Sequence, residues 1–303
     1  MNQTPKYRFE QFASTRIYTP VVSYSPDGKQ ILHVTNTTGQ FNLWTMPSGG
    51  GIPRQLTAFN DNTIRSALWL PDASAIVFQA DQNGDEQHQL YRLGAQGGWH
   101  EAITQKMDSQ HNLGDISPDG QWLAYSANDE NPMNMDVILY NIHTGEKRRI
   151  FSENNAFAIE WSPDGRYLTI LQFFGNTNMN SWLYDHQTGE TINCTPHEGD
   201  IQFIPTAWSP NSDGFFMVTN EGREFTGLAY YDIAKKSYEW YLEPDYDFEF
   251  LTISKGGNAM IWAINENGVS KLYGKNLKTN TPLSMTHLPI GVVNGLAVNP
   301  AGD

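Results

Sequence analysis

Residues 161–170 read WSPDGRYLTI and contain a four-residue turn, SPDG, that the chain repeats at nearly constant intervals. SPDG begins at Ser25, Ser117 and Ser162, and related turns begin at Leu70 (LPDA), Ser209 (SPNSDG), Ser254 (SKGG) and Asn299 (NPAG). Counted between the residues at the proline position, the spacings are 45, 47, 45, 47, 45 and 45 residues. A near-constant period over seven occurrences indicates a protein built from repeated structural units.

The chemistry of the turn residues predicts a hairpin corner in each unit. Proline presets φ for the first corner, aspartate can bond its own backbone, and glycine supplies a positive φ. We expect structural roles for these residues, and we interpret SPNSDG as a turn with two extra residues. The turn residues are Pro26, Asp27, Gly28, Pro71, Asp72, Pro118, Asp119, Gly120, Pro163, Asp164, Gly165, Pro210, Asp213 and Gly214.

Each repeat contains four short β-rich runs that are separated by turn residues. Four antiparallel strands in about 45 residues are typical of one blade of a β-propeller. The runs are almost continuously apolar, as expected of blades that are covered by neighbours on both faces. The third run of each unit carries an aromatic residue, and we expect these to share one register and fill the space between blades. They are Trp44, Tyr91, Tyr140, Tyr184, Tyr231 and Tyr273.

The repeats predict an all-β propeller of four-stranded blades, with six complete blades and the first strand of a seventh. We expect a lead-in over 1–18 and the propeller over 19–303, with blades at about 19–58, 64–105, 110–152, 155–196, 203–243 and 247–286 and a partial seventh over 292–303. A seven-bladed ring cut short and a six-bladed ring with an extra strand both fit this count. Because a natural domain rarely ends inside a hairpin, we expect a fragment of a longer protein.

The composition of the 303-residue chain argues against several classes of function. A net charge of −14 and an isoelectric point near 4.9 disfavour binding to nucleic acid or to anionic membranes. The single cysteine, Cys194, cannot form an internal disulfide, and we expect a buried structural thiol. The N-terminus lacks the apolar segment of a signal peptide, and no apolar run reaches membrane-spanning length. We therefore expect a cytoplasmic protein.

The loops between the repeats resemble those of the prolyl oligopeptidase family, especially its acylaminoacyl-peptidase-like branch. The stretch ADQNGDEQHQLYRL (80–93) resembles the second-blade signature of that family, and NDENPMNMDVILYNIHTGE (128–146) resembles the third. The stretches at 194–203, 219–232 and 265–273 follow in the family's order, and YRFEQFASTRIYTPVVSYSPDG (7–28) resembles its lead-in. SPDG blades alone are also shared with TolB-type propellers.

The resemblance implies a specific role for the propeller. Family members carry it in front of an α/β-hydrolase domain with a serine, an aspartate and a histidine, where it admits peptides and excludes folded proteins. This sequence has no G-x-S-x-G elbow, since the nearest match, GDISPDG (114–120), places proline after the serine. We expect no catalytic residues in this chain, and the implied partners are the hydrolase domain of a parent protein and peptide substrates.

Two loops supply candidate substrate contacts. In DQNGDEQ (81–87), the carboxylates of Asp85 and Glu86 suit a substrate ammonium group, because charge-assisted hydrogen bonds are strong. The alternative is an acidic cluster that pins its own loop or is simply solvated. In EGREF (221–225), Arg223 and Glu224 suit either an interblade salt bridge or a contact with a substrate carboxylate or the neighbouring domain.

The spacing of the potential ligands argues against metal sites, and we predict no metal and no cofactor. Gly84 stands at the fourth position of a would-be EF-hand loop instead of the sixth. His197 and Glu198 begin a zinc-protease motif, but Ile201 replaces its second histidine. A metal held in the central tunnel would need more ligands than Asp115 and Glu160, the acids of the innermost strands.

Two further expectations concern partners. A stand-alone TolB-like propeller that acts as a protein-interaction scaffold is the alternative to the peptidase domain. If the chain ends at residue 303, the incomplete seventh blade leaves strand edges and apolar faces without partners, which favours self-association.

Overall fold

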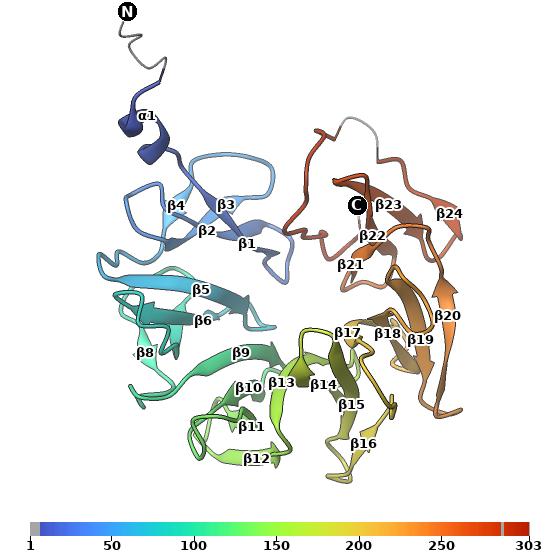
Figure 1. Cartoon of the computed structure of the whole chain (residues 1–303). Helices are drawn as coiled ribbons and strands as arrows, with labels where there is room; N and C mark the ends of the chain where they lie inside the picture. Colours follow the sequence, from blue (N-terminus) through green and yellow to red (C-terminus); the bar gives the residue numbers. More distant parts are fainter. Residues whose placement is uncertain (1–6, 286–287, 303) are drawn as a thin grey trace, which may run out of the picture.

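The computed structural model describes residues 7–285 and 288–302 and contains six four-stranded antiparallel sheets arranged as the blades of a ring (Figure 1). The strands of each sheet follow one another in chain order, with the first strand innermost and the fourth at the outer edge. The short helix α1 (Phe9–Ala13) precedes the ring and lies outside it. The prediction of an all-β propeller with six complete blades is confirmed.

The first three blades have the following strands. Blade one comprises β1 (Tyr18–Tyr24), β2 (Gln30–Thr35), β3 (Asn42–Pro47) and β4 (Arg54–Gln55). Blade two comprises β5 (Asn62–Trp69), β6 (Ala75–Gln82), β7 (Gln89–Gly94) and β8 (Glu101–Ala102). Blade three comprises β9 (His111–Ile116), β10 (Trp122–Ala127), β11 (Asp136–Asn141) and β12 (Lys147–Phe151).

The last three blades repeat this arrangement. Blade four comprises β13 (Asn155–Trp161), β14 (Tyr167–Gly175), β15 (Asn178–Asp185) and β16 (Thr191–Asn193). Blade five comprises β17 (Phe203–Trp208), β18 (Gly214–Thr219), β19 (Gly227–Asp232) and β20 (Ser237–Leu242). Blade six comprises β21 (Phe248–Ile253), β22 (Ala259–Glu266), β23 (Val269–Asn276) and β24 (Thr281–Pro282). No helix in the described ranges is long and apolar enough to cross a membrane.

One hydrogen-bond pattern explains why the SPDG turn recurs. In the first turn, the backbone N–H of Gly28 donates to the carbonyl of Ser25 at 2.8 Å, and Gly28 adopts a φ of 72°. The Ser25 hydroxyl donates to Asp27 Oδ1 at 2.6 Å, which is the main reason why the pKa of Asp27 falls to about 2. The corresponding serine and aspartate of the third and fourth turns, which start at Ser117 and Ser162, make the same contact.

The fifth turn has the same length as the others, so our interpretation of two extra residues is wrong. Ser209 N donates to Gly214 O, five residues further on, just as Ser25 N donates to Gln30 O. Ser212, with a φ of 60°, therefore occupies the position of the turn glycine. Gly214 instead begins β18, where an added Cβ would lie 2.1 Å from Tyr231 O. Glycine is needed there for close approach of two strands and not for a turn.

The aromatic residues of the third strands occupy two registers instead of the single register that we expected. Trp44, Tyr91 and Tyr273 pair with His33, Phe78 and Trp262 of the second strands. Tyr140, Tyr184 and Tyr231 pair with Leu123, Leu168 and Phe215, which stand two residues earlier in their repeats. Residues two apart in a strand point to the same face. Both registers therefore place a ring on the same face of the blade.

The seventh turn is present although the described residues contain no seventh sheet. Gly302 N donates to Asn299 O at 2.8 Å, which is the closing bond of the other turns. The carbonyl of Pro300 accepts from Gly256 N of blade six at 2.8 Å. On its other side, Asn299 lies against Gly28 of blade one, where an added Cβ would be 3.3 Å from Asn299 Oδ1. Residues 288–302 include no assigned strand, so the expected first strand of blade seven appears without sheet pairing.

The core lies between neighbouring blades. Between blades three and four, for example, Trp122 and Leu139 pack with Trp161 and Ile170 in one buried cluster. Side chains from separate repeats thus bury each other, which stabilises the ring by about 25 cal/mol per Å² of apolar surface removed from water. Each blade therefore depends on the next for its stability.

Candidate functional site

The connections between strands alternate between the two faces of the ring, because each antiparallel hairpin reverses the direction of the chain. The SPDG-type turns lie on one face, called here the turn face, together with the connections between third and fourth strands. The loops between second and third strands lie on the opposite face, called the loop face. The four candidate residues Asp85, Glu86, Arg223 and Glu224 belong to the loop face.

Asp85 and Glu86 lie in the exposed loop between β6 and β7. Asp85 Oδ1 accepts hydrogen bonds from Gln87 N at 3.0 Å and from Gln82 N at 3.3 Å, so this carboxylate holds its own loop. Glu86 has a φ of 59° and no hydrogen-bond or ion-pair partner in the part of the chain that the structure describes. The loop therefore presents the Asp85 carboxylate, which accepts hydrogen bonds from the loop backbone, and the Glu86 carboxylate, which does not.

Arg223 ties the β18–β19 loop to the connection between blades five and six. Its Nη1 lies 3.0 Å from Glu243 Oε2, and its Nη2 donates to the carbonyl of Pro244. Its guanidinium also lies 5.4 Å from the ring centroid of Trp240. These contacts support the structural role of Arg223, because its charge is already neutralised by Glu243. Glu224 is exposed, and no hydrogen bond or ion pair among the described residues joins it to Asp85, Glu86 or Arg223.

A pocket of about 410 Å³ opens on the loop face between the loops of blades two, three and four. The side-chain amides of Gln87, Gln110 and Asn134 line it, and none of them has a hydrogen-bond partner in the described part of the chain. Phe157 and Phe173 form its apolar wall. Carboxamides both donate and accept, so this lining matches the amide groups of a peptide backbone. Sequence reasoning missed this pocket, although glutamine and asparagine recur in these loops.

Asp115 of β9 and Glu160 of β13 lie on innermost strands and interact electrostatically. Burial raises the pKa of both carboxyls, and the charge of Asp115 adds to the rise at Glu160, whose pKa reaches about 8. Lys255, in the sixth turn, opposes both shifts. Asp115 Oδ2 accepts a hydrogen bond from Trp161 N at 2.9 Å, so it links blades three and four.

The residues weighed as metal ligands have other contacts. Asp81 is buried and pairs with Arg65 at 2.8 Å, and His197 Nδ1 lies 2.9 Å from the carbonyl of Thr195. Within 7–285 and 288–302, no group of three or more His, Cys, Asp or Glu side chains could hold a metal ion. Cys194 is buried as expected, and burial raises its pKa to about 12.

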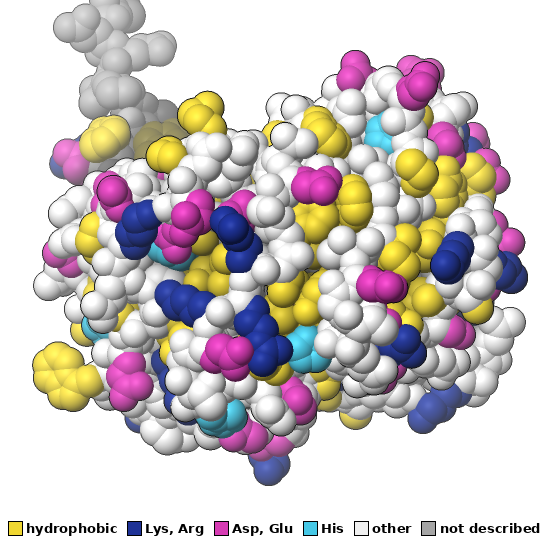
Figure 2. Space-filling view, turned by 90° about the horizontal axis from the view of Figure 1, so that it is seen from below, with side chains coloured by type: hydrophobic (Ala, Val, Ile, Leu, Met, Phe, Trp, Pro, Cys, Tyr) yellow, Lys and Arg dark blue, Asp and Glu magenta, His cyan; other side chains and the backbone are white. Residues whose placement is uncertain are grey.

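Charges of both signs are mixed on the outer edge of the ring. Figure 2 shows the molecule from the side on which β12 and β16 lie in Figure 1, with basic and acidic side chains next to one another. On and beside β12, Arg148 Nε lies 2.6 Å from Glu146 Oε1, and Arg149 Nη1 lies 3.4 Å from Asp136 Oδ2. These two arginines of the edge are thus paired with carboxylates.

This chain is a β-propeller whose blades share one sequence repeat, with a Ser-Pro-Asp-Gly hairpin between the first two strands. Residues 6–212 match the family described as the TolB beta propeller domain, PD40. This match covers more than half of the 303 residues, and the chain belongs to the PD40 family.

Two curated relatives are peptidases by name. The chain is 21% identical over 228 residues to "Dipeptidyl peptidase family member 6" of Caenorhabditis elegans, covering 68% of this chain and 30% of the relative. It is 25% identical over 222 residues to "Dipeptidyl aminopeptidase BIII" of Pseudoxanthomonas mexicana, covering 70% of this chain and 32% of the relative. The chain thus matches less than a third of the length of either protein.

Solved structures share the fold at low sequence identity. A prolyl endopeptidase superimposes with a TM-score of 0.71 at 16% identity, over 91% of this chain and 44% of that one. An oligogalacturonate lyase from Vibrio parahaemolyticus gives 0.70 at 15% identity, over 96% and 86% of the two chains. TolB from Acinetobacter baumannii gives 0.59 at 19% identity, over 88% and 62%. The similarity of this propeller to those of prolyl oligopeptidase-type proteins, which the loop sequences indicated, is thereby confirmed.

Proposed function

We propose that this chain is the propeller domain of a serine peptidase and that it restricts the access of peptides to a hydrolase domain in the same polypeptide. The similarity to two dipeptidyl peptidases carries this proposal, because it spans about 70% of this chain but only 30–32% of theirs. The remaining length of such relatives is large enough for a catalytic domain.

The ring supplies a physical basis for such a filter. Its six innermost strands surround the centre, so an extended peptide can approach where a folded domain is excluded by size. On the loop face, the unengaged carboxylates of Glu86 and Glu224 attract a substrate ammonium group. The carboxamides of Gln87, Gln110 and Asn134 complement a peptide backbone.

The first experiment compares this chain with its full-length parent. Both are treated with a fluorophosphonate probe for active-site serines and assayed with dipeptidyl and acyl-peptide chromogenic substrates. We expect labelling and hydrolysis in the parent alone. Absence of labelling in the parent would overturn the peptidase proposal.

A second experiment tests the filter in the parent. The double substitution Glu86→Gln with Glu224→Gln is expected to raise KM for peptides with a free α-amino group and to leave N-acylated peptides unchanged. Glu153→Gln, an exposed acid between blades three and four, is the matched control. An equal change for both classes of substrate would contradict a role in amine binding.

A protein-interaction scaffold is the second candidate function, and the match to the TolB family over residues 6–212 favours it. A scaffold requires no hydrolase domain. A parent protein that fails to react with the serine probe but retains a defined binding partner would support this alternative.

We further propose that the isolated chain self-associates through the outer face of blade six. Leu272 on this face is partly exposed, whereas Leu228, its equivalent in blade five, is fully buried because blade six packs against it. A pocket of about 380 Å³ next to Tyr273 is lined mainly by apolar groups, including Trp262, Leu272 and Leu283. Sedimentation equilibrium is expected to show dimers that Leu272→Glu dissociates, and a monomer at high concentration would contradict this.

A further inference from the structure

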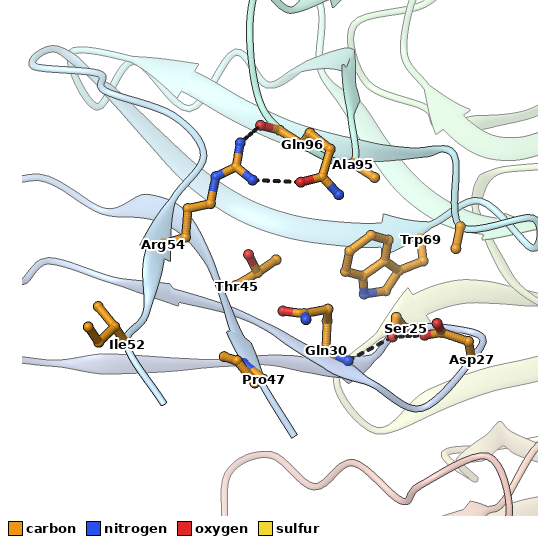
Figure 3. Close-up of a pocket in the computed structure, with 11 residues that line it drawn as sticks. Ser25, Asp27, Gln30, Thr45, Pro47, Ile52, Arg54, Trp69, Ala95 and Gln96 are labelled. Carbon is orange, nitrogen blue, oxygen red and sulfur yellow. Dashed lines mark hydrogen bonds between the residues drawn. The ribbon is translucent and has the colours of Figure 1, made fainter. Parts of the chain in front are cut away.

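A third pocket lies on the turn face between blades one and two and is independent of the peptidase proposal. It has a volume of about 320 Å³, which is at the lower end of the range for small-molecule sites. Figure 3 shows Arg54 and Gln96 on one side, Trp69 on another and Gln30 opposite, with Thr45 between them. Pro47 and Ile52 add apolar surface at the edge.

The pocket lies where blades one and two have smaller side chains than the equivalent positions of blades three and four. Gln30 corresponds to Trp122 of blade three, since each accepts the bond from the serine that opens its turn. Ala95 corresponds to His186 of blade four, since each donates its N–H to the third residue after the turn proline. Trp69 corresponds to Trp161, since each is the last residue of the first strand of its blade, β5 or β13.

The equivalent interface between blades three and four is filled. The ring of His186 lies 5.6 Å from that of Trp122 and 5.3 Å from that of Trp161, both edge to face. Arg148, the equivalent of Arg54 in strand pairing, lies 4.5 Å above the Trp122 ring. No such ring contacts are present around Trp69 in the described residues.

Hydrogen-bond donors without partners converge on the pocket. Trp69 is 7% exposed, and its indole Nε1 is buried with no hydrogen-bond partner. The Trp161 indole also lacks one, but His186 packs against that ring, whereas Trp69 borders open space. The Gln30 amide and the Thr45 hydroxyl likewise have no partner in the described part of the chain. A buried donor without a partner is unfavourable, so a ligand that supplies an acceptor is favoured.

The charges near the pocket favour an anion. Arg54 is held in place by Gln96, because its Nη1 donates to Gln96 Oε1 at 2.6 Å and its Nη2 donates to the Gln96 carbonyl. The guanidinium keeps its positive charge, since its partners are neutral. The Asp27 carboxylate also lines the pocket, where it pairs with Lys29 Nζ at 3.2 Å and accepts a hydrogen bond from the Ser25 hydroxyl.

We propose that this pocket binds the carboxylate of a small ligand that also carries an apolar side chain. The carboxylate accepts from the Trp69 indole, the Gln30 amide and the Arg54 guanidinium, while the side chain packs against Pro47 and Ile52. A free carboxylic acid and the C-terminal residue of a peptide present this same chemistry. The site lies on the face opposite the candidate substrate loops, so its role is distinct from contacts with a peptide on that face.

The test follows the indole ¹H–¹⁵N resonances of the tryptophans during titration with N-acetyl-L-leucine. The Trp69 resonance is assigned by its loss in Trp69→Phe. We expect N-acetyl-L-leucine to shift this resonance and N-acetyl-L-leucinamide to bind at least about tenfold more weakly, which corresponds to about 1.4 kcal/mol. Equal binding of the acid and the amide would overturn the proposal. The absence of a shift at about 10 mM acid would also overturn it, because this concentration exceeds the largest dissociation constant expected of such a site.

Two substitutions separate filling of the pocket from loss of its charge. Gln30→Trp introduces the residue found in blade three and is expected to abolish binding, with circular dichroism as a check on folding. Arg54→Met is expected to weaken binding of the acid at least about tenfold without affecting the amide. Arg148→Met, at the equivalent position of the filled interface, is the matched control and should leave binding unchanged. Unchanged binding in Arg54→Met would contradict carboxylate recognition.

A pair of longer probes distinguishes the two sources of the carboxylate. A tetrapeptide ending in leucine with a free carboxylate is compared with its C-terminal amide. If the free tetrapeptide binds as tightly as N-acetyl-L-leucine, the site accepts peptide C termini. If only N-acetyl-L-leucine binds, the site accepts small free acids. Both outcomes require the carboxylate and support the proposal.

Discussion

The interface between blades one and two has the same backbone arrangement as the interface between blades three and four. The two interfaces differ in whether side chains fill the space beside the tryptophan. At the first, Gln30 and Ala95 leave a pocket next to Trp69. At the second, Trp122 and His186 enclose Trp161. The turns that position these side chains have the same hydrogen bonds in both places. The repeat therefore determines where a side chain stands, and its size and polarity determine whether the interface is core or pocket.

The innermost strands differ between these interfaces as well. Blades three and four place Asp115 and Glu160 three residues before the turn proline, where blades one and two place Ser23 and Leu68. The filled interface thus combines a dense aromatic cluster on the turn face with two carboxyl groups toward the centre of the ring. The hollow interface has no such carboxyl pair, and its ring contacts in the described residues involve Phe78 and Tyr91 and not Trp69. Four sets of substitutions test what this contrast contributes to stability.

The largest effect is expected from removing the tryptophan of each interface. Trp161→Ala should lower the free energy of unfolding by about 4 kcal/mol, because the lost ring is packed on several sides. Trp69→Ala should cost about 2 kcal/mol, because one side of its ring already borders a pocket. Urea denaturation of both variants measures the difference. Equal losses would show that the pocket does not weaken the packing of Trp69.

Glu160→Gln should change the pH dependence of stability. Burial and the Asp115 charge raise the pKa of Glu160 to about 8, so the folded state keeps its proton where the unfolded chain has lost it. Stability is therefore highest below the ordinary glutamate pKa and falls as pH rises towards 8. The variant should be more stable than the parent sequence by about 2 kcal/mol at high pH and should show a flatter profile.

The control for this pH experiment is Glu153→Gln, since Glu153 is exposed at the start of the same blade. Its denaturation profile between about pH 5 and pH 9 should follow that of the parent sequence. A Glu160→Gln profile that keeps the full fall in stability would indicate that another group titrates there.

A smaller gain is expected from filling the hollow interface. Ala95→Ile copies Ile142 and Ile233, which occupy this position in blades three and five. The added apolar atoms should raise the free energy of unfolding by about 1 kcal/mol. The reverse change, Ile142→Ala, should lower it by about 3 kcal/mol. A loss of stability in Ala95→Ile, measured by thermal unfolding, would mean that the pocket walls cannot accommodate a larger side chain.

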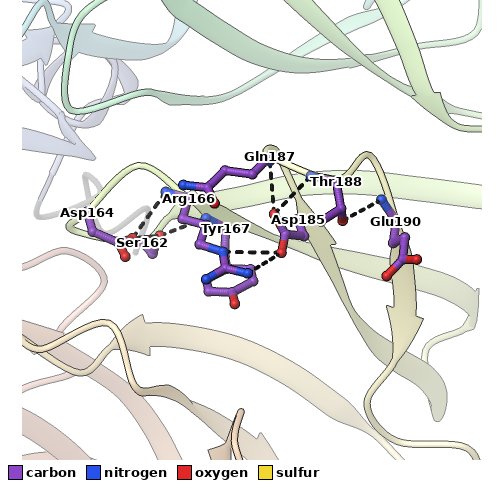
Figure 4. Close-up of polar contacts among 8 residues, drawn as sticks. All are labelled: Ser162, Asp164, Arg166, Tyr167, Asp185, Gln187, Thr188 and Glu190. Atoms are coloured by element: carbon purple, nitrogen blue, oxygen red, sulfur yellow. Dashed lines mark hydrogen bonds and ion pairs between the residues drawn. The ribbon is translucent and has the colours of Figure 1, made fainter.

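The smallest effect concerns an ion pair that blade four has and blade two lacks. Figure 4 shows Arg166 of the fourth turn pairing with Asp185, where Arg166 Nη2 lies 2.8 Å from Asp185 Oδ2. Blade two has Ser74 and Gly94 at the two positions. Burial opposes ionisation of Asp185, but hydrogen bonds from Arg166 and the backbone outweigh it and lower its pKa.

Arg166→Met should therefore lower stability only slightly at neutral pH, because the arginine is partly exposed and solvent screens its charge. The stabilisation by the pair is present above the ordinary aspartate pKa and is lost as the pH falls through the lowered value. The difference between variant and parent in urea denaturation should shrink at low pH and at high salt. A difference that is the same at all salt concentrations would indicate lost packing rather than lost charge.

The sequence supported the fold more strongly than the site. The period and the turn chemistry were sufficient to predict six four-stranded blades, because a hairpin depends on residues that are neighbours in the chain. Within that frame, the lengths of individual turns were less certain, and SPNSDG was misread because Ser212 adopts the conformation expected of glycine. The candidate loop residues were located on one face, but Arg223 is engaged by Glu243, which sequence spacing could not reveal.

The repeat, the antiparallel blade and the positions of the hairpin corners could thus be predicted from the residue pattern, since all three depend on local backbone chemistry. Tertiary structure alone decided which side chains of neighbouring blades meet. Gln30, Arg54, Trp69 and Ala95 form a pocket only because the ring brings blades one and two together. A position-by-position comparison of the repeats shows that Gln30 and Ala95 stand where blades three and four have Trp122 and His186, but only packing shows that the space between them is left open.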